Sequence, residues 1–185
     1  MKVLLVRHAK KARDLPEVDD RNLPLSKEGV MEVQGLAEEF AKKGLRPNLY
    51  LSSRYAHAIE TARLLAEHLG GGSVAEVVPI DALTPHYPYT FSLIVREAAE
   101  LGFGLGSLNT VGMALHYPRI HQLTAELTSS PIEQEDPGYA AATCVAADSL
   151  ESLLAGQGHT CQLWRRSKEG ILTTRDYSTF EHGGI

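Results

Sequence analysis

The sequence predicts an α/β fold: a three-layer sandwich in which helices cover both faces of a mostly parallel central sheet. Short apolar runs alternate with longer segments of helical periodicity along the 185 residues, the order produced by parallel strands joined by helices. Clusters of glycine and proline separate these segments. No internal repeat, low-complexity segment or change of composition divides the chain, so we expect one domain over residues 1–185.

The chain is expected to start with a strand, a loop and a long helix. Residues 2–6 form an apolar run, and the polar, proline-containing residues 14–24 are expected to form the loop. Ser26 is a candidate N-cap of the helix, and Gly44 ends it. The apolar residues of this helix recur at helical spacing: Val30, Val33, Leu36, Ala37 and Phe40.

A second strand, a second helix and a third strand are expected next. Residues 49–51 form a short apolar run, and residues 75–80 are strand-like. Between them, residues 55–69 show helical periodicity and stop at the glycines 70–72. One face of this helix is apolar: Ala58, Ala62, Leu65 and Leu69.

The middle of the chain is expected to contain a loop, two helices and a central strand. Residues 81–89 carry prolines and tyrosines, which favour an irregular surface loop. Residues 91–101 and 118–127 are expected to be helical, the latter starting at a proline, which a first helical turn tolerates. Residues 109–115 are apolar and contain a glycine, which is typical of a central strand.

The last third of the chain is expected to add strands to the sheet. A loop is expected over residues 131–137, followed by strands at 139–147 and 160–165. Residues 171–174 are expected to form a final edge strand, and the glycines near the end of the chain suggest a loose tail.

Composition excludes several classes of protein. The formal net charge is −5, so no nucleic-acid partner is expected. No apolar run reaches the roughly 18 residues of a membrane-spanning helix, and the N-terminal apolar run is too short for a signal peptide. Cys144 and Cys161 form no CxxC pair. We expect a cytoplasmic protein with reduced thiols and no membrane partner.

Polar side chains follow three of the expected strands. These runs are Arg7-His8-Ala9-Lys10, Ser52-Ser53-Arg54 and His116-Tyr117-Pro118. Ligands of open α/β sheets bind at the carboxyl ends of the strands. The guanidinium of Arg7 can bind two phosphate oxygens, Ser53 adds a donor, and His8 or His116 supplies a neutral imidazole that can attack phosphorus. Together they predict a site for phosphoryl transfer, without a P-loop.

The order of these motifs resembles the histidine phosphatase superfamily, in the branch that contains the phosphoglycerate mutases. Residues 7–9 match its Arg-His-Gly/Ala signature, and residues 20–29 match an acidic-Arg stretch that leads to Leu-Ser/Thr-x-x-Gly. Residues 52–62 follow its Ser-Ser-Pro-x-x-Arg-Ala-x-x-Thr-Ala pattern, and residues 116–118 its His-x-Pro. The resemblance covers roughly residues 1–130, and within the superfamily the chain looks most like small phosphohistidine phosphatases of the SixA type.

The resemblance implies a phosphoglycerate mutase-like fold and a covalent mechanism. His8 would attack the phosphoryl group, Arg7 would bind its equatorial oxygens, and His116 would stabilise the charge in transfer. Water would then hydrolyse the phosphohistidine, with no metal and no organic cofactor. The expected partner is a phosphorylated protein or a small phosphorylated substrate. Homodimerisation stays open.

Two residues depart from the family pattern at the phosphate site. The second family arginine is replaced by His57, and Arg54 stands where a proline is usual. We hypothesise that Arg54 swings in to restore the charge, because residues three apart share a helix face; Arg21 is a further candidate. Leu115 is bulkier than the glycine common before the distal histidine, and is expected to shift the entry of His116.

The general acid is not evident either. Mutase-like members of the branch use a glutamate after the third strand, where this chain offers Asp81 and His86. A phosphohistidine has a good leaving group, so the missing glutamate favours a phosphoramidate substrate. The alternatives are a catalytically impaired relative that binds a phosphorylated partner and a small-molecule phosphatase or mutase. A zinc site built on His8 and His116 lacks a third placed ligand.

Overall fold

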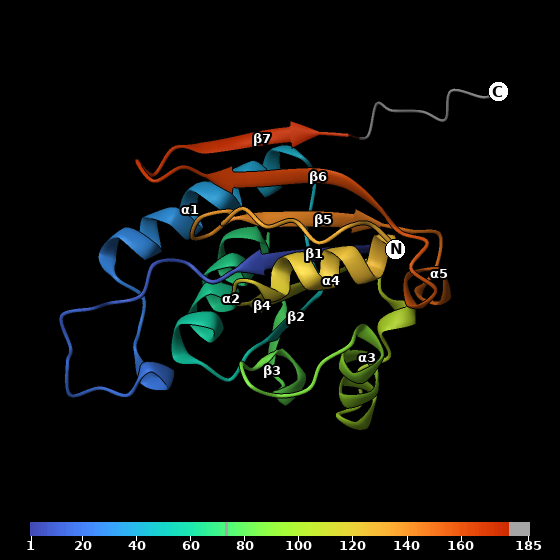
Figure 1. The fold of residues 1–185 in the computed structure, drawn as a ribbon, viewed down its shortest axis with the longest axis horizontal. Helices are drawn as coiled ribbons and strands as arrows, with labels where there is room; N and C mark the ends of the chain where they lie inside the picture. Colours follow the sequence, from blue (N-terminus) through green and yellow to red (C-terminus); the bar gives the residue numbers. More distant parts are fainter. Residues whose placement is uncertain (73, 178–185) are drawn as a thin grey trace.

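A seven-stranded mixed sheet forms the centre of the computed structural model, which describes residues 1–72 and 74–177 (Figure 1). The strand order is β3-β2-β4-β1-β5-β6-β7. The strands are β1 (Lys2–Arg7), β2 (Leu49–Ser52), β3 (Glu76–Pro79), β4 (Thr110–Leu115), β5 (Ala142–Ala146), β6 (His159–Arg166) and β7 (Leu172–Asp176).

The sheet is parallel on one side of β1 and antiparallel on the other. β3, β2, β4 and β1 run parallel, whereas β5, β6 and β7 each run antiparallel to their neighbours. The predicted parallel sheet is therefore found in the first four strands. Only residues 167–171 separate β6 from β7, and so short a connection gives an antiparallel pair, whereas α4 precedes β5 and α5 precedes β6.

Helices cover both faces of the sheet, as the sequence predicts. α1 (Lys27–Lys42) and α2 (Ala56–Leu69) pack on one face, and α3 (Phe91–Glu100), α4 (Arg119–Thr128) and α5 (Leu150–Leu154) on the other (Figure 1). Because side chains alternate across a strand, β1 contributes to both cores. In the described part of the chain, no helix has the length and apolar composition needed to cross a bilayer.

Most elements agree with the sequence prediction to within a few residues. The exceptions are short or buried. α5 was not expected, and its five residues are too few to show a helical period. The loop at residues 14–24 contains a 3₁₀ turn at Asp20–Asn22. The segment at residues 81–89 is not entirely on the surface, because Ala82 and Leu83 are buried under α3.

The first turn of α1 is built against the loop that follows β1. Ser26 Oγ accepts the Gly29 N–H at 3.0 Å and donates to the Lys10 carbonyl at 3.1 Å. A Cβ at position 29 would clash with that carbonyl, so only glycine allows the approach. One turn later, the Glu32 carboxylate accepts the Lys10 N–H at 2.9 Å. α1 therefore holds the loop that carries His8.

The two cysteines lie side by side on β5 and β6. Both are buried and neither forms a disulfide. The Cys161 thiol donates to Cys144 Sγ at 2.9 Å. They belong to the core beneath α1, away from the carboxyl ends of β1 and β4.

Candidate active site

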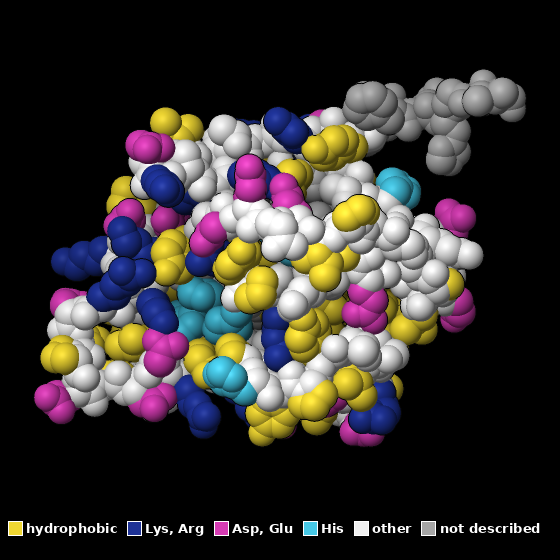
Figure 2. Space-filling model, in the orientation of Figure 1, with side chains coloured by type: hydrophobic (Ala, Val, Ile, Leu, Met, Phe, Trp, Pro, Cys, Tyr) yellow, Lys and Arg dark blue, Asp and Glu magenta, His cyan; other side chains and the backbone are white. Residues whose placement is uncertain are grey.

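Three histidines converge at the carboxyl ends of the parallel strands. His8 follows β1, His116 follows β4, and His57 lies in the first turn of α2, directly after β2. The ring centroids are 4.3 Å apart for His8 and His57, 4.8 Å for His8 and His116, and 5.4 Å for His57 and His116. The residues are 6%, 0% and 8% exposed for His8, His57 and His116. Histidine side chains are visible near the middle of the face in Figure 2, with Lys and Arg side chains beside them.

The backbone fixes which ring nitrogen of two of these histidines is free. His8 Nδ1 lies 2.8 Å from the Ala9 carbonyl oxygen, and His57 Nδ1 lies 3.1 Å from that of Leu23. A carbonyl oxygen can only accept, so each Nδ1 carries the proton and each Nε2 carries a lone pair. His8 Nε2 is thus prepared to act as a nucleophile. His57 Nε2 is buried and has no hydrogen-bond partner among the described residues.

Ser53 positions the third histidine. Its Oγ accepts the Tyr55 N–H at 3.3 Å and lies 2.9 Å from His116 Nε2. This arrangement lets the hydroxyl donate to His116. The Ser53 N–H in turn donates to the Ala114 carbonyl at 2.9 Å, which ties the end of β2 to β4. The ring of Tyr55 closes one side of the cluster, edge-on to His116 at 5.0 Å.

All three imidazoles are held in the neutral form. Burial lowers the pKa of His8 well below its ordinary value of 6.5, and the neighbouring His57 and His116 lower it further. Burial likewise lowers the pKa of His57 and brings the pKa of His116 to about 3. A buried cation loses its hydration and is repelled by a second cation nearby. The nucleophilic form of His8 is therefore the resting form at neutral pH.

Arg7 lies beside the cluster and is paired with a carboxylate. Its guanidinium is buried over the ring of Tyr139, with Cζ 4.3 Å from the ring centroid. Its Nη1 forms an ion pair with the exposed Asp136, while its buried Nε has no partner in the part of the chain that is described. Asp136 also accepts the Gly138 N–H at 2.8 Å. The sequence analysis missed Asp136, because an acidic residue in a loop gives no signal of its own.

Arg54 lies outside the cluster in this structure, so the hypothesis that it swings in to restore the missing charge stays a prediction. Arg54 is exposed, and its Nε donates to Asp81 at 2.5 Å while its Nη2 lies 3.5 Å from the other oxygen of that carboxylate. Asp81 thus holds the guanidinium outside the cluster. Arg21 is also exposed, and its backbone N–H donates to the side chain of Asp19, which caps the 3₁₀ turn. Among the described contacts, neither arginine touches the histidines.

A lysine missed by the sequence analysis lies closer to the cluster. The ammonium of Lys11 forms an ion pair with Asp20, on the 3₁₀ turn before α1. Both charges act on the pKa values of His57 and His116, Lys11 lowering them and Asp20 raising them. A Lys-Lys pair after a strand is common on protein surfaces, so its place could not be predicted from sequence.

The remaining candidates lie outside the cluster. Asp81 is bound to Arg54, and His86 is exposed with a φ of 73°. Leu115, which is expected to shift the entry of His116, is buried in the core on the opposite face of the sheet. The alternation of β4 sends Ala114 to the α2 face and Leu115 to the α4 face.

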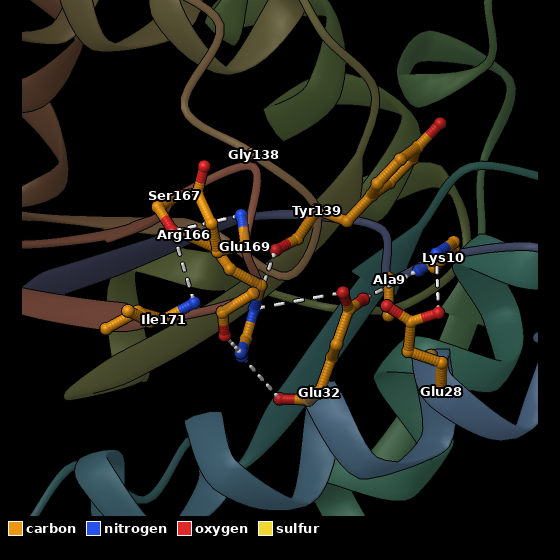
Figure 3. Close-up of polar contacts among 12 residues, drawn as sticks. Ala9, Lys10, Glu28, Glu32, Gly138, Tyr139, Arg166, Ser167, Glu169 and Ile171 are labelled. Atoms are coloured by element: carbon orange, nitrogen blue, oxygen red, sulfur yellow. Dashed lines mark hydrogen bonds and ion pairs between the residues drawn. The ribbon is translucent and has the colours of Figure 1, made fainter.

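A cavity of about 550 Å³ opens next to Arg7. Arg166 forms part of its wall and is fully engaged, since it donates to the carbonyls of Tyr139, Gly170 and Glu32 at 3.2, 2.8 and 3.1 Å (Figure 3). Lys10, which pairs with Glu28 at 2.5 Å, also lines the cavity. The wall further includes Arg13, Asp136 and Lys168. Arg166 thus shapes the wall, and Lys10 and Arg7 give it a positive side.

Solved structures with this arrangement of elements include several phosphatases and a mutase. The protein histidine phosphatase SixA complexed with tungstate aligns with a TM-score of 0.68 and 21% identity, over 86% of this chain and 94% of that chain. A mycobacterial glucosyl-3-phosphoglycerate phosphatase aligns with a TM-score of 0.57 and 18% identity, over 86% of this chain and 96% of that chain. A phosphoglycerate mutase from Bacillus anthracis str. Sterne aligns with a TM-score of 0.57 and 17% identity, over 85% of this chain and 96% of that chain. At these identities the likeness establishes the fold.

The sequence itself carries the family pattern in its first half. No curated protein matches it significantly. Residues 3–84, which run from β1 to the turn after β3 and include Arg7, His8 and His57, match the histidine phosphatase superfamily (branch 1). Residues 3–84 therefore carry the sequence pattern of the histidine phosphatase superfamily (branch 1), and the described chain has the fold of the solved structures above.

Proposed function

We propose that this protein is a phosphatase that works through a phosphohistidine on His8. The observation that carries the proposal is the Nδ1–H···O=C bond of His8, which leaves a neutral Nε2 lone pair beside the guanidinium of Arg7. His8 Nε2 would form a bond to phosphorus while the bond between phosphorus and the leaving group breaks. Water would then attack phosphorus, release His8 and yield inorganic phosphate.

Arg7 and His116 are proposed to stabilise the charge of the group in transfer. Arg7 would exchange Asp136 for two phosphoryl oxygens, which its planar donors fit. Ser53 and His116 form a hydrogen-bonded pair on the other side of His8. His57 presents a lone pair rather than a donor, so it binds a phosphoryl oxygen only where that oxygen or the imidazole carries a proton.

The substrate that fits best is a phosphohistidine, as in the SixA type, on a protein surface. The cavity beside Arg7 is lined by more cations than carboxylates, and this excess of positive charge, to which Arg13 and Lys168 contribute, favours an acidic partner. No glutamate occurs between Glu76 and Glu97, and Glu97 binds the N–H groups of Asp81 and Ala82. A phosphoramidate needs little help from a general acid, whereas an alkyl phosphate needs more.

One observation favours a second candidate, a phosphate-binding relative with impaired turnover. The family arginine is absent at position 57, and Arg7 is already paired with Asp136. Loss of one charge-assisted contact costs about 1.5–3 kcal/mol, which corresponds to about one to two decades in rate. Such a protein would bind phosphate and turn over slowly.

The test is phosphate release from a phosphohistidine peptide, an aryl phosphate and several sugar phosphates. Wild type is compared with His8→Asn and with His121→Gln, a buried histidine outside the cluster. We expect turnover by wild type and His121→Gln, a preference for the phosphohistidine peptide, and none by His8→Asn. A preference for sugar phosphates would overturn the substrate assignment. Phosphate binding without turnover in wild type would favour the second candidate.

A further inference from the structure

The three-histidine cluster has the composition of a metal site. One ring nitrogen of each of His8, His57 and His116 lies within 4.8 Å of the other two. Zn²⁺ bound by imidazole at about 2.0–2.1 Å in a tetrahedron brings such nitrogens to about 3.4 Å from one another. Binding would therefore require the three side chains, which lie on separate elements, to draw closer together.

Two of the three histidines, His8 and His57, have the hydrogen bonds of metal-ligating histidines, whereas His116 Nε2 lies 2.9 Å from Ser53 Oγ. A ligating imidazole donates its second ring N–H to a carbonyl or carboxylate, which fixes its tautomer and orientation. His8 and His57 both donate Nδ1–H to backbone carbonyls. The fully buried Nε2 of His57 has no partner among the described residues, and a metal ion would supply one.

The charges near the cluster are largely compensated. Two of the three cations near it, Arg7 and Lys11, are each paired with a carboxylate, Asp136 and Asp20. Arg119 hydrogen-bonds to the carbonyls of Ala82 and Tyr87 and lies over Tyr89. The arginine usual in the family at position 57 would leave only two histidines in the cluster and would add a positive charge. His57, which replaces that arginine, is therefore the residue that provides the third ligand.

We propose that His8, His57 and His116 bind one Zn²⁺ ion through a ring nitrogen each. Three neutral nitrogens with an open fourth position suit zinc better than magnesium or calcium, which prefer oxygen. The ion would take the Nε2 lone pair of His8, so metal binding and phosphorylation of His8 exclude each other. That last consequence rests on the proposed phosphatase function, whereas the metal site itself does not.

The test is titration of the metal-free full-length protein with Co²⁺, followed by its visible absorption, and competition with Zn²⁺. We expect one ion per chain with the intense bands of a tetrahedral site. His57→Gln and His57→Arg each remove one ligand. Loss of a residue that only orients a ligand costs about 10–100-fold in metal affinity. We therefore expect each His57 variant to bind Co²⁺ at least about a hundredfold more weakly than wild type. His121→Gln, also buried, should bind as wild type does.

Two results would overturn the site: no saturable absorption in folded wild type, or affinities of both His57 variants equal to that of wild type. Near-ultraviolet circular dichroism shows whether each variant folds, and if both fail to fold, His8→Gln removes a ligand on another element. A separate phosphatase assay with and without stoichiometric Zn²⁺ tests the exclusion. Zinc binding without any phosphatase activity would support the metal site and refute the proposed function, so the two failures are distinguishable.

Discussion

At the scale of single residues, His57 limits the positive charge of the proposed phosphate site. Its Nδ1 proton is used by the Leu23 carbonyl, and its burial opposes a second proton. The site therefore relies on Arg7 for its permanent charge near His8. The replacement was visible in the sequence, but the direction of its free nitrogen depended on the loop at Leu23, which no local pattern reveals.

Arg54 is expected to contribute little to phosphate binding. Its guanidinium is exposed and bound to Asp81, and exposed ion pairs are worth about 0–1 kcal/mol. Arg54→Ala should therefore change the affinity for inorganic phosphate, measured by calorimetry, by no more than about twofold. A loss of tenfold or more would show that Arg54 turns into the site when phosphate binds.

Asp136 is expected to compete with phosphate for Arg7. Asp136→Asn removes the charge and keeps an oxygen that can accept the Gly138 N–H. Because the carboxylate is exposed, its removal should improve phosphate affinity by only about two- to fivefold. Glu135→Gln makes the same charge change in the same loop, at a residue that pairs with Arg165, and should have no such effect. Weaker binding by Asp136→Asn would show that Asp136 supports the site instead.

At the scale of elements, the junction between α1 and the His8 loop could be predicted only in part. The N-cap role of Ser26 followed from residue type, and the structure confirms it. The bond from Ser26 Oγ to Lys10 and the contact of Gly29 with the Lys10 carbonyl join segments distant in sequence. Those contacts depend on how the helix packs, so a reading of either segment alone misses them.

Gly29→Ala is expected to destabilise the protein, because its Cβ would meet the Lys10 carbonyl. Overpacking of this kind costs about 1–3 kcal/mol of unfolding free energy. The control is Gly35→Ala in the same helix, where a Cβ meets nothing within 4 Å. It should stabilise the protein by up to about 1 kcal/mol. Urea unfolding of both variants checks this, and equal effects would contradict the close approach at residue 29.

At the scale of the whole molecule, the order of strands and helices was predictable, but the directions of the last three strands were not. Strands β1 to β4 are separated by helices long enough to force parallel crossovers. For the strands expected after α4, the sequence did not indicate whether they pair parallel or antiparallel with their neighbours. In the structure β5, β6 and β7 are antiparallel. Similarly, Arg7, His8, Ser53 and His116 could be located from strand ends, whereas Asp136 comes from a loop whose path depends on the tertiary fold.

The buried histidines should make stability depend on pH. The unfolded chain binds protons at each histidine near pH 6.5, but the folded chain holds the pKa of His8, His57 and His116 lower, to about 3 for His116. The unfolded state therefore binds more protons between these values, and the free energy of unfolding falls as pH drops below 6.5. The slope reaches at most about 1.4 kcal/mol per pH unit for each histidine.

Urea unfolding at pH 7, 6 and 5 checks this dependence. His116→Gln should show a shallower loss of stability toward low pH than wild type. Equal slopes for the two proteins would contradict the assignment of His116 as a neutral buried group.

The central claim is that His8 carries the phosphoryl group during turnover. The most direct measurement is to mix the protein with a phosphohistidine peptide, quench it in denaturant at neutral to alkaline pH, and determine the intact mass and the modified peptide. The account predicts one phosphoryl adduct on the peptide that contains His8, labile in acid, and absent from His8→Asn. Turnover by His8→Asn, or an adduct located on another residue, would contradict it.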